Sequence, residues 1–398
     1  MLDDATRAQI RHSAALLHTV GDQLVEHFYQ RLLRHHPELG IFFNATHLHK
    51  RELQAAMSRA AAFYAEHNDQ PENLQPMLQH IACKHASLGV RPEHYPLIGE
   101  HMLKSLEEVL GPLASETVLH TWRMAFSELS GKLIAMEAEL YRHALQQKGG
   151  FSGWRRFAIG KKEEECQDTA SLYLYPVDGG RVPAFLPGQY ISLRGLDFHW
   201  NQLAPRQYSL SAAPNGRYLR ITAQRETDEG HPPGQASELI LQHLRQGDEV
   251  ELSMPQGDFV LQESSAPAVL IGNGIGLTPL LAMLESRLQA GLPAVWVYGC
   301  PDGARHPLRA PLRKLLADHP ATRQAVFYEH PSAGDKHNQD YHFSGHIDLS
   351  SAGVLALPDA HYYLSGPAAQ MRPLLAALRR RQIAEERIHY QNFGPGEK

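Results

Sequence analysis

The sequence has few cysteines, no long apolar run and no excess of basic charge, and each absence excludes a class of protein. Cys83, Cys166 and Cys300 have no paired spacing, which excludes a disulfide framework and a zinc ribbon and fits a reducing compartment. No segment approaches the ~20 apolar residues of a membrane-spanning helix. The N-terminus lacks the basic and apolar regions of a signal peptide. We therefore expect a cytoplasmic protein without a membrane span.

The charge balance favours small-molecule partners. The 398 residues carry a formal net charge of -5, with 43% hydrophobic and 20% charged residues, as in globular proteins. A net negative charge does not indicate the basic surface that binds nucleic acid. The length indicates two or three domains, and we expect a monomer.

Hydrophobic periodicity divides the chain into three segments. Residues 1–147 follow a period of ~3.6, which predicts an all-α domain. After a glycine-rich linker, residues 148–263 hold short β-type runs between turn signals, which predict an antiparallel β-barrel. In residues 264–398 strands alternate with helices, which predicts an α/β domain with a parallel sheet. The expected fold is therefore multi-domain.

One histidine of the helical segment lies where an apolar side chain is expected. In "CKHASLGVRPEHYP", His85 shares a helical stripe with Leu78, Ile81 and Leu88, just before Gly89 ends the helix. An inward imidazole must be hydrogen-bonded, paired or bound to something. A satisfied core histidine is the commoner outcome of such a pattern, and a ligand is the alternative.

A carboxylate in the last helix of this segment is a candidate partner for His85. Glu137 flanks an apolar stripe that includes Leu133 and Met136. If Glu137 is buried, the His85 Nδ1–H and the Tyr95 hydroxyl could both bind it, which would fix the imidazole tautomer and make the imidazole a more basic ligand. The alternative is a surface glutamate at the edge of the stripe.

The third segment contains a glycine-rich turn. "LIGNGIGLTP" sets Gly272, Gly274 and Gly276 between a buried strand and a helix, where the phosphates of a nucleotide can approach backbone N–H groups. The spacing departs from the common dinucleotide motif, and glycines here can also serve the turn alone.

The barrel segment carries groups that suit a flavin. "RQYSLS" offers Arg206 for a phosphate, Tyr208 as a flat face and Ser209 as a short hydroxyl. "GQASELI" places Gly234 and Ser237 at a helix start, which is either an anion site or an ordinary N-cap.

These motifs, with "YLSGP" and the terminal "NFGP", resemble the ferredoxin-NADP reductase superfamily over residues 155–398. The resemblance implies FAD, with Ser209 near flavin N5 and Phe393 against the isoalloxazine, and it implies a nicotinamide dinucleotide. The residues expected to hold FAD are Gln189, Tyr190, Arg206, Gln207, Tyr208, Ser209, Gly234, Gln235, Ala236, Ser237 and Phe393. Those expected to hold NAD(P)H are Gly272, Asn273, Gly274, Ile275, Gly276, Leu277, Thr278, Pro279, Ser365, Gly366 and Pro367.

Two residues depart from that superfamily where nicotinamide should meet flavin. Ser365 stands where the family often carries cysteine, and Asn392 is an unfamiliar neighbour of the terminal aromatic. We expect hydride transfer to proceed, because a serine hydroxyl can occupy the same position. Arg305 and Arg309 could meet the 2′-phosphate of NADPH or form a solvated face, and the resemblance favours NADH.

Residues 1–147 resemble the globin domain of flavohaemoglobins, so the resemblance covers essentially the whole chain. "HFYQRLL" carries the distal Tyr29, "IFFN" the haem-packing Phe43, "KHASLGVRPEHYP" the proximal His85 and Tyr95, and "AMEAELY" Glu137. The resemblance implies haem b with His85 as the iron ligand, and an apolar distal pocket that could also admit a lipid.

The distal helix departs from the family, which commonly places a glutamine facing the ligand. Counting without gaps puts Leu53 at that position, Gln54 about 100° away and Met57 one turn on. Tyr29 is then the strong donor to bound O₂. A shift of one residue would bring Gln54 inward instead.

The resemblance predicts a nitric oxide dioxygenase. NAD(P)H would reduce FAD, FAD would reduce haem, and ferrous haem with bound O₂ would convert NO to nitrate. Tyr29, Tyr95 and Glu137 are the expected catalytic residues. One alternative is a reductase of hydroperoxides, quinones or ferric iron. Another is a haem-based gas sensor or oxygen store, which would gain nothing from a strongly donating ligand.

Overall fold

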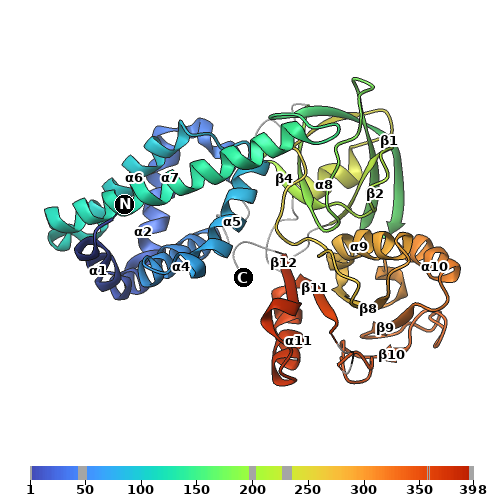
Figure 1. The fold of residues 1–398 in the computed structure, drawn as a ribbon. Coiled ribbons are helices and arrows are strands. Elements are labelled where there is room, and N and C mark those ends of the chain that lie inside the picture. The colour runs from blue at the N-terminus through green and yellow to red at the C-terminus, as the bar shows by residue number, and fades with distance from the viewer. Residues whose placement is uncertain are drawn as a thin grey trace.

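The structure is a computed structural model that describes residues 2–43, 52–196, 203–225, 235–355, 357 and 359–393. Three domains follow one another along the chain (Figure 1). The first is helical, as its periodicity predicts. Its elements are α1 (Asp4–His12), α2 (Ala14–His35), the 3₁₀ turn η1 (Pro37–Phe42), α4 (Glu52–His67), α5 (Pro71–Leu88), α6 (His94–Leu110), the 3₁₀ turn η2 (Gly111–Leu113) and α7 (Glu116–Gln146).

The ends of α5 follow from two residues. Pro71 begins the helix, where a missing N–H costs no hydrogen bond, and Gly89 ends it with a φ of 80°, which suits a residue without Cβ. The Val90 N–H then donates to the His85 carbonyl at 3.0 Å. The apolar side of α5, with Leu74, Leu78 and Ala82, is buried in the core of the domain.

The second domain is the predicted antiparallel barrel. Its strands are β1 (Arg155–Cys166), β2 (Thr169–Pro176), β3 (Tyr190–Gly195), β4 (Arg206–Ser209), β5 (Leu219–Gln224) and β6 (Glu249–Leu252). They pair in the order β4-β3-β6-β1-β2-β5, and a bridge between Leu210 and Ile221 joins the two ends of that order. The helix α8 (Gln235–Gln242) contributes Ile240 to the core inside the barrel.

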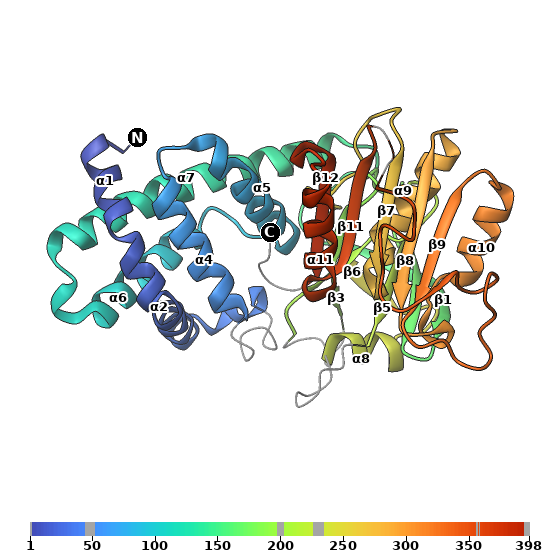
Figure 2. The same cartoon turned by 90° about the horizontal axis from the view of Figure 1, so that it is seen from below.

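The third domain contains the predicted parallel sheet. Its strands are β7 (Ala268–Asn273), β8 (Ala294–Cys300), β9 (Arg323–Tyr328), β10 (Phe343–Ser344), β11 (His361–Pro367) and β12 (Ile388–Phe393). They pair in the order β10-β9-β8-β7-β11-β12 (Figure 2). Helices α9 (Leu277–Gln289) and α10 (Arg309–Asp318) cover one face, and α11 (Ala368–Arg380) covers the other. The short turns η3 (Gly274–Gly276), η4 (Gly303–Arg305) and η5 (Glu385–Arg387) complete it.

The barrel and the α/β domain are joined by partly buried polar contacts. Arg220 of β5 forms an ion pair with Glu285 of α9 at 3.3 Å, and the Leu308 N–H donates to Glu165 of β1 at 3.1 Å. Among the described residues, no helix is both long and apolar enough to cross a membrane.

The segment between the helical domain and the barrel is packed rather than loose. A Cβ on Gly150 would lie 1.9 Å from the Ala144 carbonyl oxygen. A Cβ on Gly149 would lie 2.5 Å from the Val182 carbonyl oxygen. Glycines are therefore needed here because backbones meet closely, in addition to marking the change of domain.

Candidate functional site

The helical domain brings His85, Tyr95 and Glu137 together from three helices. The His85 Nδ1 lies 2.8 Å from Glu137 Oε1 and 3.0 Å from the Tyr95 hydroxyl oxygen, and the Tyr95 hydroxyl donates to the same carboxylate oxygen. Glu137 is only 2% exposed, so it is not a surface glutamate. Burial and the neighbouring Glu137 carboxylate raise the pKa of Tyr95, which keeps its hydroxyl proton available for donation.

This arrangement suits an imidazole that binds a metal through Nε2. Because the carboxylate accepts from Nδ1–H, it fixes the tautomer that leaves Nε2 as the basic atom. The His85 side chain is 30% exposed and therefore accessible, whereas Glu137 behind it is not. The donor set, one imidazole in apolar surroundings, fits the proximal side of a haem.

Tyr29 brings a hydroxyl into an apolar cluster on a second wall of the same domain. Its ring lies edge-on to Phe43, with ring centroids 5.0 Å apart, and its hydroxyl lies 3.6 Å from the Met57 sulfur. A thioether is a weak acceptor, so this contact leaves the donor available for a better partner. Burial raises the pKa of Tyr29, so the hydroxyl stays protonated.

On α4, Leu53 and Met57 share one face and pack in the cluster that contains Tyr29. Gln54 is 7% exposed and lies about 100° around the helix from Leu53. Leu53 and Met57 therefore lie on the side of Tyr29, as the ungapped count expects, and the direction of Gln54 stays a prediction. The roles of these three residues toward a ligand remain a prediction.

In the barrel, strand pairing brings two predicted flavin residues side by side. Tyr190 of β3 pairs with Ser209 of β4, and the Leu210 N–H donates to the Gln189 carbonyl at 2.9 Å. Arg206 begins β4, and Gln207 and Tyr208 continue it. Ala236 and Ser237 lie in the first turn of α8, which begins at Gln235, whereas Gly234 lies outside the described residues.

The three nucleotide motifs meet at the carboxyl edge of the parallel sheet. Gly272 of β7, Ser365 of β11 and Gln391 of β12 form one row across neighbouring strands, and Phe393 pairs with Pro367 two residues further on. Asn273 ends β7, Ile275 lies in η3, and Leu277, Thr278 and Pro279 form the first turn of α9. Nucleotides bind at this edge of parallel sheets.

Close packing explains one of the turn glycines. A Cβ on Gly276 would lie 2.0 Å from the Ser365 carbonyl oxygen and 2.7 Å from the Gly366 nitrogen. Gly276 therefore lets the turn after β7 approach the end of β11. Gly274 has a φ of 55°, so the turn itself also favours glycine there.

Two buried hydroxyls give this region the character of a cofactor site. Ser209 Oγ and Ser365 Oγ make no hydrogen bond within the described part of the chain. Such groups are costly unless a ligand or water completes them. They are the two hydroxyls predicted to lie where flavin and nicotinamide meet, so the residues fit both groups.

The arginines considered for a 2′-phosphate are engaged elsewhere. Arg305 pairs with Asp302 at 2.9 Å, and Arg309 pairs with Asp340 at 2.9 Å. Arg313 binds Asp340 as well. A phosphate would have to compete with these carboxylates for the guanidinium groups, so the pairing favours the dinucleotide without a 2′-phosphate.

The sequence interpretation missed the contact between the helical domain and the barrel. Ser87 of α5 binds Ser192 of β3 and Gln207 of β4, and His80 of α5 lies 3.2 Å from Asp258. No local period reveals such contacts, because they depend on how two surfaces meet. The nearest sequence signal is a small polar residue two positions after the inward histidine.

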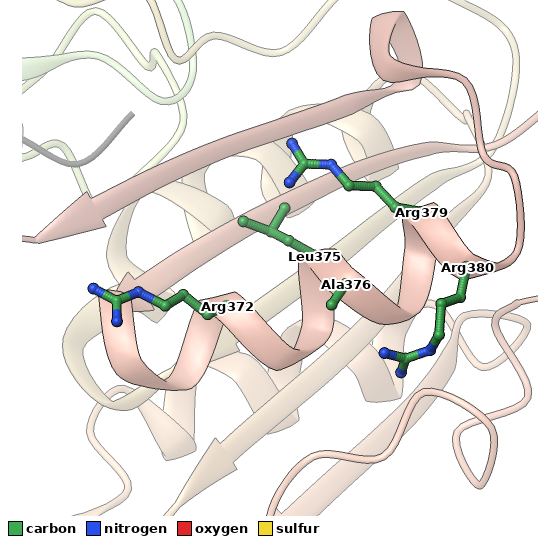
Figure 3. Close-up of a pocket in the computed structure, with 5 residues that line it drawn as sticks. All are labelled: Arg372, Leu375, Ala376, Arg379 and Arg380. Atoms are coloured by element: carbon green, nitrogen blue, oxygen red, sulfur yellow. The ribbon is translucent and has the colours of Figure 1, made fainter.

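A hollow along α11 is lined by none of the predicted site residues (Figure 3). Arg372, Arg379 and Arg380 line it together with Leu375 and Ala376. Arg379 is bound to Glu385 through two hydrogen bonds of 2.7 and 3.0 Å. This arginine is therefore already occupied by a carboxylate.

Two family models match the chain. The globin model matches residues 26–133, and the oxidoreductase NAD-binding domain model matches residues 270–374.

Related proteins match over the full length. A flavohemoprotein of Chromobacterium violaceum is 43% identical over 403 residues and covers 100% of both chains. One of Rhizobium meliloti is 40% identical over 99% of both.

Two solved structures resemble the structure of this chain. A flavohemoglobin of Malassezia yamatoensis with bound FAD and heme has a TM-score of 0.85 at 25% identity, and covers 99% of this chain and 100% of its own. The FAD/NAD-binding domain of a nitric oxide dioxygenase of Vibrio cholerae has a TM-score of 0.55 at 34% identity, and covers 61% of this chain and 99% of its own. Since the likeness extends through the helical, barrel and α/β domains, the chain belongs to the flavohaemoprotein family.

Proposed function

We propose that this protein is an NADH-dependent nitric oxide dioxygenase that binds haem through His85, FAD between the barrel and the α/β domain, and NADH at the carboxyl edge of the parallel sheet. The bound groups supply hydride acceptance, division of an electron pair into single electrons, and oxygen chemistry. The relative from Vibrio cholerae carries the same activity in its name.

The proximal contacts carry this proposal. The buried carboxylate of Glu137 accepts from His85 Nδ1–H, and the Tyr95 hydroxyl holds that carboxylate in place. An imidazole with a carboxylate partner donates more electron density through Nε2. That favours activation of O₂ over reversible carriage, which distinguishes an oxygenase from an oxygen store or a gas sensor.

On the other wall, Tyr29 presents a protonated hydroxyl next to Phe43 and Met57. Its donor can orient a small polar ligand, while the apolar side chains around it exclude water. The same apolar lining could admit a lipid chain.

The hydroxyls of Ser209, on β4 of the barrel, and of Ser365, at the edge of the parallel sheet, are the groups that we expect to donate toward the flavin and the nicotinamide. The carboxylates Asp302 and Asp340, which hold Arg305 and Arg309, favour NADH over NADPH. A reductase of hydroperoxides, quinones or ferric iron would use this same edge. The residues of the barrel and the α/β domain therefore do not show which molecule finally accepts the electrons.

The test is a comparison of acceptors. Purified protein with its cofactors receives NADH and O₂ together with NO, a hydroperoxide, a quinone or ferric citrate, and the products are measured. We expect NO to be consumed fastest, with nitrate as the product. Faster turnover of any other acceptor, with NO consumed slowly, would replace this proposal with that reductase activity.

A further inference from the structure

Helix α5 presents opposite sides to the two halves of the molecule. His85 meets Glu137 and Tyr95 inside the helical domain. Ser87 lies two residues on, about 200° around the helix, and faces the barrel. The same helix therefore carries the proposed iron ligand on one side and contacts the proposed flavin strands on the other.

The Ser87 hydroxyl makes three hydrogen bonds, two of them across that contact. It donates to the Lys84 carbonyl at 2.8 Å, and it accepts from the Ser192 hydroxyl at 3.1 Å and from the Gln207 amide at 2.8 Å. One donor and two acceptor positions are all that a hydroxyl offers. Ser87 and Ser192 are both 0% exposed, so the hydrogen bond between these two hydroxyls is sealed from solvent.

The strand residues at this contact are themselves tied into the barrel. The Ser192 N–H donates to Ser253 Oγ at 2.9 Å, and the Ser253 N–H donates to the Ser192 carbonyl at 2.9 Å. Gln207 precedes Tyr208 and Ser209 on β4. The contact of Ser87 is therefore with a fixed part of the sheet, next to residues proposed to hold the flavin.

We propose that Ser87 is a positioning residue that fixes helix α5 on strands β3 and β4 and so sets the rate at which single electrons pass from the flavin to the haem iron. Each transfer oxidises the reduced flavin by one electron and reduces ferric iron to ferrous iron, and NADH supplies the electron pair. This inference rests on the proposed function, because it requires both cofactors in one chain.

The hydroxyl, rather than the size of the side chain, is the feature that matters. Without it, the buried Ser192 hydroxyl would lose its acceptor, and the amide of the exposed Gln207 would lose a hydrogen bond that water can replace. An unmet buried donor is costly, so the surfaces would separate slightly or admit water. Either change lengthens or loosens the connection between α5 and the strands.

The test compares Ser87→Ala with Ser105→Ala, which removes the hydroxyl of an equally buried serine on α6 away from the barrel. Amide hydrogen exchange is measured in protein with and without cofactors. In Ser87→Ala we expect exchange of residues 83–88 and 189–194 to accelerate about fivefold or more, since fivefold corresponds to ~1 kcal/mol, the loss of one hydrogen bond. Ser105→Ala should leave these amides unchanged.

Rapid mixing with NADH without oxygen then separates two rates. Flavin bleaching in Ser87→Ala should match the unmodified protein, while haem reduction should be slower. Ser192→Ala removes one donor from the barrel side. It should reproduce part of the faster amide exchange and part of the slower haem reduction, and it replaces Ser87→Ala as the test if that variant does not fold. In the double variant, Ser192→Ala should slow haem reduction further by less than it does when introduced alone, because Ser87→Ala has already removed the shared hydrogen bond.

Two outcomes would overturn the inference. Unchanged exchange at residues 189–194 in both variants would show that Ser87 does not hold the contact. Faster exchange with haem reduction at the normal rate would make Ser87 a docking contact without influence on electron passage. Failure of the unmodified protein to consume NO would reject the proposed function instead, and it would leave both of these measurements interpretable.

Discussion

Individual residues carry the chemistry of the proposed site, and the sequence could indicate only part of it. The stripe of α5 predicted that His85 faces inward, and the structure places it against Glu137. Spacing alone could not bury Glu137, because a residue at the edge of a stripe can turn either way until the neighbouring helix is in place. Glu137 is buried because α5, α6 and α7 meet around it.

The carboxylate behind His85 gives a first prediction. Glu137→Gln should weaken electron donation through the imidazole, because a neutral amide accepts a weaker hydrogen bond from Nδ1–H. We expect slower NO turnover with near-normal O₂ binding and a lower iron–histidine stretching frequency by resonance Raman spectroscopy. Turnover and frequency equal to those of the unmodified protein would remove Glu137 from the mechanism.

The distal wall gives a second prediction. Tyr29→Phe keeps the ring against Phe43 and deletes the donor. O₂ dissociation from the reduced protein should accelerate about tenfold, the effect of one lost hydrogen bond of ~1.5 kcal/mol.

Gln54→Leu is the matched comparison, because in the ungapped count Gln54 lies about 100° around the helix from Leu53, the position that faces the ligand. It should change the O₂ dissociation rate little when measured by the same rapid mixing. Comparable acceleration in both variants would show that Gln54 faces the ligand and that the ungapped count is wrong.

At the scale of elements, the helices and strands were the most predictable part of the molecule. Proline and glycine mark the ends of α5, and the change of period marks the barrel and the parallel sheet. The contact of α5 with β3 and β4 could not be predicted, because Ser87 resembles any small polar residue of a helix until the barrel is placed against it.

The turn after β7 gives a third prediction. Gly276→Ala would place a methyl group 2.0 Å from the Ser365 carbonyl oxygen, so η3 and the end of β11 must move apart. We expect a higher KM for NADH and a loss of ~1–3 kcal/mol in the free energy of unfolding, as for other overpacked sites.

The control for this change is Gly131→Ala on the exposed side of α7, where a Cβ meets nothing within 4 Å. It should raise stability by ~0.5–1 kcal/mol, because alanine suits a helix interior better than glycine. Urea unfolding measures both variants. An unchanged KM for NADH in Gly276→Ala would show that the close approach of these segments does not shape the nucleotide site.

At the scale of the whole molecule, a buried histidine makes the α/β domain sensitive to acid. Burial lowers the pKa of His306 from 6.5 to about 3, and its Nδ1 lies 3.0 Å from the Tyr328 hydroxyl oxygen. Between these pH values the unfolded chain binds a proton that the folded chain does not. Stability therefore falls as pH decreases from 6.5 toward 3, by up to ~1.4 kcal/mol per pH unit.

His306→Gln should flatten this dependence, whereas His12→Gln, on an exposed position of α1, should not. The free energy of unfolding in urea at pH 7, 6 and 5 measures the slope. The same slope in His306→Gln and in the unmodified protein would assign the acid sensitivity to other groups.

The central claim is that one chain passes electrons from NADH to oxygen chemistry at a haem held by His85. The most direct measurement compares the unmodified protein with His85→Ala, each purified with its flavin and given NADH, O₂ and NO, with nitrate and NADH quantified. We expect two nitrates per NADH from the unmodified protein. The variant should contain FAD without haem, reduce ferricyanide with NADH and form no nitrate. Nitrate formation by His85→Ala at the normal rate, or a normal haem spectrum in that variant, would contradict the account.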